Sequence, residues 1–256
     1  MDLPPPPPVD DHDVVVVPGV RGLRGAPSVP WPFWEAVLVY LIGALILGGG
    51  AAALLFTISD SSGMAIVGSV VADLVFLGAM LSWLGRRSPD WRDRVRVRFD
   101  RGEAVRGFLL GIVLYPAVAL VALVVVQWVM ERFTGGDVEP PDQLPEGLSP
   151  GFKALTVVLV VVIAPVVEEL FYRGVLYRSV RDRYGVTWGL VVSSLLFGLA
   201  HYVPASAADV LLLQAVMVAT GLGLAAIYEW RGSLVANVFA HAAFNAIGVV
   251  LIFSSS

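Results

Sequence analysis

The sequence predicts an all-α membrane protein, a polytopic bundle of about seven transmembrane helices. Hydrophobic residues make up 57% of the 256-residue chain and charged residues 15%, and the mean hydropathy is +0.79. A soluble domain usually carries about 25% charged residues. Apolar stretches of about 20 residues, long enough to cross a hydrocarbon core, follow one another along the chain. Arginine collects in alternate connections between them, as expected when a chain crosses a membrane repeatedly.

The first 33 residues are predicted to form a disordered, proline-rich tail. The segment opens with a run of prolines, continues with acidic residues around His12, and then carries scattered Gly and Pro. It lacks the basic region and the apolar core of a signal peptide, and a proline run favours extended polyproline II. His12 is therefore interpreted as a solvated side chain. The transmembrane domain is assigned to residues 34–256.

Apolar runs define the expected spans. The third and seventh are the clearest, and the fifth is short. The fourth continues into an arginine-rich stretch that ends at Tyr184-Gly185, so we expect its helix to project beyond the membrane. The expected spans cover residues 35–58, 64–84, 107–130, 152–172, 187–203, 208–228 and 233–253.

The distribution of arginine predicts the orientation. The connections after the second, fourth and sixth spans are rich in arginine, whereas the opposite connections are mainly acidic. By the positive-inside rule the arginine-rich connections are cytoplasmic. The N-terminus is then cytoplasmic and the C-terminus outside, in a multi-pass protein of the plasma (inner) membrane. The basic stretch 86–106 is interpreted as a topology determinant, with contact to anionic lipid headgroups as the alternative.

Composition also excludes several functions. The net charge of −4 does not suggest a nucleic-acid partner, so the expected partners are the lipid bilayer and a substrate within it. The chain has no cysteine, which excludes disulfides, thiol nucleophiles and thiolate metal ligands. Any metal ion would need histidine and carboxylate ligands.

Ionisable and amide side chains interrupt the apolar fourth, fifth and seventh spans. A charged group at membrane depth costs on the order of 2.5 to 3.5 kcal/mol, so a group of them predicts a functional site. They form three short signatures: Glu168-Glu169-x-x-x-Arg173, Phe197-x-x-x-His201 and His241-x-x-x-Asn245.

Counting along the helices predicts that these side chains share a depth. Glu168 precedes the turn at Tyr184-Gly185 by the same number of residues as His201 follows it. In antiparallel helices that rise ~1.5 Å per residue, both lie ~24 Å from the turn. His241 lies about 12 Å from the start of the last span at Ser233, which agrees roughly.

The two glutamates are expected to have different roles. Glu168 and Glu169 point about 100° apart around a helix axis. Glu169 and Arg173 are four residues apart, with the acid on the N-terminal side, which favours an ion pair. Glu168 is therefore predicted to be the reactive carboxylate.

A polar stripe is predicted on the last helix. Asn237, His241 and Asn245 are spaced by four and share one face. Buried polar side chains in membrane helices often only link helices, and Asn237 is interpreted in this way. Gly221 and Gly223 are expected to permit close helix packing. For Asp73, in the second span, the sequence identifies no partner.

These residue types indicate hydrolysis. A glutamate shielded from water can act as a general base near neutral pH, so Glu168 would activate a water molecule. His201 would hold the same water or pass its proton to the leaving amine, and His241 and Asn245 would donate hydrogen bonds to the oxyanion. The chain lacks the His-Glu-x-x-His helix of zinc proteases and the Gly-x-Ser-Gly of intramembrane serine proteases.

The three signatures, in this order on separate spans, resemble the CPBP family. That family comprises type II CAAX prenyl proteases and Abi-like bacteriocin-processing or immunity proteins, and the resemblance covers residues 150–253. It implies an intramembrane endopeptidase that acts on a membrane-associated peptide or protein, with or without a prenyl group. It further implies that Glu168 and His201 activate water, that His241 and Asn245 bind the oxyanion, and that Glu169 and Arg173 organise the site.

Two questions stay open at this point. The preferred interpretation needs no cofactor, but zinc held by Glu168, His201 and His241 is an alternative, since two histidines and carboxylates can ligate zinc. A non-catalytic binding or immunity protein and a small proton-coupled transporter are alternative functions, because both would also use polar groups in a membrane.

Overall fold

The computed structural model describes residues 22–23, 25–59, 61–135, 137–139, 141 and 147–255. Within these ranges the chain folds into helices joined by short connections, without a β-strand. Six of the described helices are long and apolar enough to cross a membrane, and a seventh apolar helix is shorter. The predicted all-α, multi-pass fold is therefore confirmed.

Several of the long helices contain π-helical stretches, labelled η, which divide them into labelled parts. Their bounds are α1 (Phe33–Val39), η2 (Tyr40–Gly48), α2 (Gly49–Phe56), α3 (Ser62–Arg87), α4 (Trp91–Arg94), α5 (Arg101–Leu114), η3 (Tyr115–Leu120), α6 (Val121–Thr134), α7 (Pro150–Val158), η4 (Leu159–Ile163), α8 (Ala164–Glu168), η5 (Glu169–Tyr177), α9 (Arg178–Tyr184), α10 (Val186–Ala200), α11 (Ala207–Arg231) and α12 (Leu234–Ser255).

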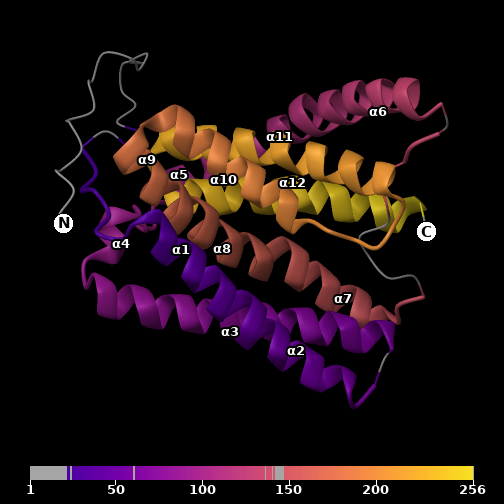
Figure 1. The fold of residues 1–256 in the computed structure, drawn as a ribbon, viewed down its shortest axis with the longest axis horizontal. Coiled ribbons are helices and arrows are strands. Elements are labelled where there is room, and N and C mark those ends of the chain that lie inside the picture. Colours follow the sequence, from indigo (N-terminus) through magenta and orange to yellow (C-terminus); the bar gives the residue numbers. More distant parts are fainter. Residues whose placement is uncertain are drawn as a thin grey trace.

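The helices form one bundle in which α7 to α9 run through the middle (Figure 1). This continuous helix covers Pro150–Tyr184, 35 residues, and is ~52 Å long at ~1.5 Å per residue. A hydrocarbon core is about 30 Å thick, so this helix is longer than one membrane crossing requires. All nine residues of η5 are buried, because neighbouring helices surround this part of the long helix.

The fifth apolar helix ends earlier than predicted. Helix α10 stops at Ala200, whereas the sequence suggested residue 203, and residues 201–206 form an irregular segment that leads to α11. The physical reason is Pro204, which disfavours helical backbone in the residue before it. Ser206 then caps α11 by accepting a hydrogen bond from the Asp209 amide at 3.2 Å.

Helix α12 is held against α5 by two glycines. A Cβ at Gly107 would overlap the carbonyl oxygen of Ala236, and a Cβ at Gly111 would overlap that of Ala240. Small residues four apart let membrane helices approach closely in this way. The contact helps to fix the rotation of α12, whose adjacent face, about 100° further around the axis, carries Asn237 and His241 toward α8 and η5.

The predicted N-terminal tail falls into two parts. Residues 1–21 and 24 lie outside the described residues. Residues 25–32 differ from the prediction, because they pack against the end of the bundle formed by α4 and α9 (Figure 1). Val29 and Trp31 are buried in the main hydrophobic core. Burial of these large apolar side chains explains why this part of the predicted tail packs onto the bundle.

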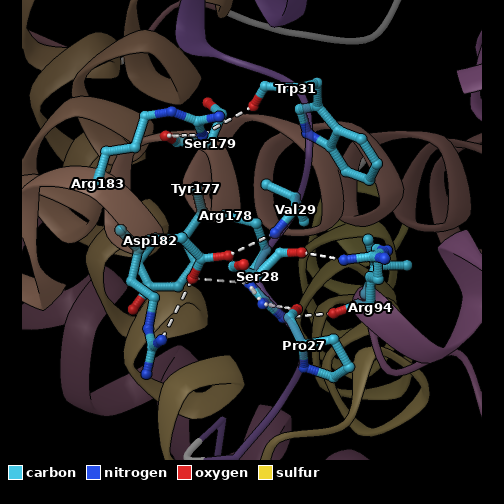
Figure 2. Close-up of polar contacts among 12 residues, drawn as sticks. Pro27, Ser28, Val29, Trp31, Arg94, Tyr177, Arg178, Ser179, Asp182 and Arg183 are labelled. Carbon is cyan, nitrogen blue, oxygen red and sulfur yellow. Dashed lines mark hydrogen bonds and ion pairs between the residues drawn. The ribbon is translucent and has the colours of Figure 1, made fainter. Parts of the chain in front are cut away.

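Polar contacts fasten this segment, which we call the N-terminal strap (residues 25–32), to α9 (Figure 2). Arg178 is fully buried, and it donates to the Pro27 carbonyl at 2.7 Å and to Asp182 at 2.9 Å. The Val29 amide donates to the same Asp182 carboxylate at 3.0 Å. The Trp31 indole donates to the Val175 carbonyl at 3.1 Å. Each buried polar group of this contact thus has a partner.

Candidate active site

Glu169 is the anchor of the polar cluster. Its carboxylate is fully buried and accepts from Arg173 Nη1 at 2.7 Å, which confirms the predicted ion pair. His241 Nδ1 lies 2.8 Å from the same carboxylate, and Asn237 donates to its other oxygen. A buried charge is tolerated when it is paired and hydrogen-bonded, and Glu169 meets both conditions.

Arg173 links this anchor to two other helices. Its Nη2 donates to the Gly221 carbonyl on α11 at 3.1 Å, and its guanidinium lies 4.6 Å from the centre of the Phe197 ring on α10. Gly221 also permits the predicted close packing, since a Cβ there would lie 3.1 Å from Ser194. Arg173 therefore joins η5, α10 and α11 at one point.

Glu168 has fewer polar contacts than its neighbour. Its side chain is 27% exposed, and within the described chain it has no direct hydrogen bond. Its nearest ionisable partner is His241, whose Nε2 lies 3.8 Å from the carboxylate. Glu168 thus faces open space beside a histidine, whereas Glu169 is held from all sides.

His201 lies directly after the last residue of α10. Its Nδ1 is 2.8 Å from the Phe197 carbonyl, and its ring lies 4.7 Å from the Phe197 ring. A carbonyl oxygen only accepts, so Nδ1 carries a proton and Nε2 is left free. The centre of the His241 ring lies 5.9 Å from the centre of the same Phe197 ring. Phe197 therefore contacts the rings of both histidines.

A cavity of about 390 Å³ brings the predicted residues together. Its walls are mostly apolar and come from the end of η3, α6, η4, α8, α10, α11 and α12. A few polar side chains converge on an apolar pocket in this way at many binding sites. The polar lining consists of Glu168, His201, Thr220, His241 and Asn245.

Asn245 lies in the cavity wall with part of its amide already used. Its Nδ2 donates to the Val160 carbonyl at 2.8 Å, which ties α12 to η4. An amide nitrogen carries two hydrogens, so one is left for a ligand. The side chain can therefore serve both as a link between helices and as a donor.

Asn237 and Phe197 have contacts that the sequence does not specify. Asn237, interpreted as a link between helices, does link α12 to η5, and its acceptor is Glu169, so it also holds the anchor. Its place one turn before His241 on the same helix face was the available signal. Phe197 was noted only as part of a signature, and its contacts with Arg173 and both histidines depend on tertiary packing.

Zinc held by Glu168, His201 and His241 is the alternative to a metal-free site. Among the residues that the structure describes, no three His, Asp or Glu side chains converge in a way that could hold a metal ion. His241 directs Nδ1 to Glu169, and His201 directs Nδ1 to a backbone carbonyl. Both rings therefore keep Nε2 available, an arrangement that zinc-binding histidines also use.

These features define the class of the protein, a multi-pass helical membrane protein with a glutamate and histidine cluster between its helices. Residues 150–247 match the family described as type II CAAX prenyl endopeptidase, Rce1-like, and this match supports membership of the CPBP family. The matched segment contains all three signatures, and it supports a protease-like membrane enzyme. No curated protein and no solved structure matches the chain.

Proposed function

We propose that this protein is an intramembrane endopeptidase that hydrolyses a peptide bond of a membrane-associated protein or peptide by water that Glu168 and His201 activate. The observation that carries the proposal is the position of Glu168. It is a carboxylate without a direct hydrogen bond among the described residues, and it shares an apolar cavity with two histidines. The family match makes peptide hydrolysis the chemistry to test.

In the proposed reaction a water molecule lies between the Glu168 carboxylate and the free Nε2 of His201. Glu168 takes one proton as the water oxygen attacks the peptide carbonyl carbon, which gives a tetrahedral oxyanion. When the carbon–nitrogen bond breaks, the same proton passes from Glu168 to the leaving amine. The products are a carboxylic acid and an amine, and no covalent enzyme intermediate forms.

His241 and Asn245 are the proposed donors to the oxyanion. His241 Nδ1 donates to Glu169, so its Nε2 can donate when the ring carries both protons. Asn245 has one amide hydrogen left beside the cavity. Donors that are fixed before the reaction stabilise developing charge without reorganisation. Glu169 and Arg173 would organise the site by fixing His241.

The proposed mechanism uses no cofactor. Glu168 can act as a general base and His201 can hold the water without a metal ion. A zinc-dependent mechanism is the alternative, and the effect of a chelator on cleavage distinguishes the two mechanisms.

The proposed location is the plasma (inner) membrane, with the N-terminus in the cytoplasm and the C-terminus outside. The N-terminal strap, α4, and the α9–α10 and α11–α12 turns lie at one end of the bundle, opposite the C-terminus (Figure 1). The connections at that end hold most of the arginines, which favours a cytoplasmic position. The lipid bilayer and a membrane-associated substrate are the proposed partners, without nucleic acid.

Cleavage of a quenched peptide library tests the proposal. Wild-type protein in lipid nanodiscs would be compared with Glu168→Ala and His201→Ala, each with and without a strong chelator. The expected result is cleavage by the wild type alone, unchanged by the chelator. Loss of cleavage on chelation would show a metalloenzyme. Equal behaviour of all three proteins would favour the non-catalytic binding alternative, and proton flux abolished by Glu168→Ala would favour the transporter.

A further inference from the structure

Asp73 is a carboxylate without a structural explanation. It lies near the middle of the apolar helix α3 and is half-buried. Among the residues that the structure describes, it makes no hydrogen bond or ion pair. A carboxylate at this depth is costly, and a residue that only linked helices would bond to one of them. It also lies outside the family-matched segment.

Asp73 lines a second cavity, of about 330 Å³, which also contains Glu168 and His201. Glu168 and His201 therefore border both cavities. The first cavity is closed mainly by α11 and α12, whereas η2 and α3 line the second, so the two cavities adjoin different groups of helices. The second cavity is more polar than the first, with hydroxyl groups among its lining residues. The hydroxyl groups belong to Tyr40, Tyr172 and Tyr202, and Asp73 adds a carboxylate.

The irregular segment after α10 gives an independent indication of water. Helix α10 has 15 residues and spans ~22 Å, whereas its antiparallel neighbour α11 has 25 residues and spans ~37 Å. Residues 201–206 therefore run beside the N-terminal turns of α11, and in the proposed membrane orientation part of this segment lies at membrane depth. Non-helical backbone at that depth occurs only inside protein or along a water-filled cavity. Residues 200–203 line the second cavity, and the Tyr202 side chain is exposed.

We propose that the second cavity is a hydrated compartment that supplies water to Glu168, and that Asp73 is a positioning residue that holds this water. The other, apolar cavity then receives the substrate. Substrate and water reach the catalytic carboxylate from different cavities, so bound substrate does not block the supply of water. The role of Asp73 in catalysis rests on the proposed function, but the hydration of the cavity does not.

Cysteine accessibility tests the hydration without any substrate. The chain has no cysteine, so each variant carries a single reactive thiol. Asp73→Cys and Val203→Cys would be treated in nanodiscs with a charged, water-soluble methanethiosulfonate reagent. The control is Leu74→Cys, because Leu74 is next to Asp73 on α3 but is 50% exposed on the outer surface. A thiol must ionise to react, so it reacts in water and not in lipid.

We expect both cavity variants to react at least about tenfold faster than Leu74→Cys. Equal rates at all three positions would overturn the proposal. Val203→Cys keeps Asp73 in place and lies in the segment that lines the cavity, so the test stands even if Asp73→Cys does not fold.

Kinetics of Asp73 variants test its positioning role. Asp73→Leu removes every hydrogen bond to water, and we expect kcat to fall about tenfold or more while KM changes less than about threefold. Asp73→Asn can still bond water and should retain most of kcat. A merely structural residue would give the opposite result, a thermally more stable Asp73→Leu with unchanged kcat. If Glu168→Ala also proves without effect on cleavage, the proposed function fails, and the labelling rates still decide the hydration.

Discussion

The adjacent carboxylates of Glu168 and Glu169 have different surroundings in this site. Glu169 is fully buried and accepts from Arg173, Asn237 and His241, so its charge is fixed and satisfied. Glu168 points into a cavity and has only His241 Nε2 nearby, at 3.8 Å. The helix itself causes the difference, because successive residues point about 100° apart. Glu168 is therefore the carboxylate that water in the cavity can reach, whereas Glu169 is enclosed by its partners.

Replacing the anchor residue Glu169 should lower the free energy of unfolding. Glu169→Ala leaves the buried Arg173 guanidinium and His241 without their shared acceptor. Breaking a buried ion pair costs about 3–5 kcal/mol, so we expect a clear fall in the thermal midpoint in detergent. The double variant Glu169→Gln with Arg173→Met removes both charges and should recover much of this loss. Equal destabilisation in both variants would show that the ion pair is not the cause.

At the scale of the element, glycine contacts set the position of α12. Gly111→Ala places a methyl group on the Ala240 carbonyl, one residue before His241. Overpacking of this kind costs about 1–3 kcal/mol, and the displaced helix should also move His241 and reduce activity. Gly78→Ala is the matched control, because a Cβ at Gly78 meets nothing within 4 Å. Parallel measurement of unfolding and cleavage checks this, and equal effects of the two variants would contradict it.

The N-terminal strap should contribute to the stability of the bundle. Trp31 is fully buried, contacts Trp83 with ring centres 5.3 Å apart and bonds to Val175. Trp31→Ala should therefore destabilise the protein by about 3–5 kcal/mol. Trp34 is 60% exposed, and Trp34→Ala should change the unfolding midpoint little. If the two variants unfold alike, the strap is not part of the stable core.

Much of the helical architecture could be predicted because the rise of a helix is constant. Counting from the turn at Tyr184-Gly185 placed Glu168 and His201 at one level, and both line the same cavity. The end of α10 was missed because the apolar run continues past Ala200, and Pro204 acts on the residue before it. The packing of the strap was missed because proline and glycine suggested disorder, while Trp31 found a partner far along the chain.

At the scale of the whole molecule, the site joins segments that the sequence separates widely. The family match covers residues 150–247, yet α3 contributes Asp73 and the end of η3 and α6 contribute apolar walls. Such neighbours depend on the packing of distant helices, which periodicity within one helix does not encode. The second cavity and the contacts of Phe197 and Asn237 were unpredictable for the same reason.

The measurement that tests the central claim most directly is kcat for a cleaved peptide in wild type and Glu168→Gln, with chelator present throughout. Glu35→Gln is the control, since Glu35 pairs with Arg87 away from both cavities. Loss of a general base lowers the rate about 10²–10⁴-fold, and we expect a fall of this size for Glu168→Gln alone, with the fold intact. Wild-type kcat in Glu168→Gln would contradict the account, because no other carboxylate faces the substrate cavity among the residues that line it.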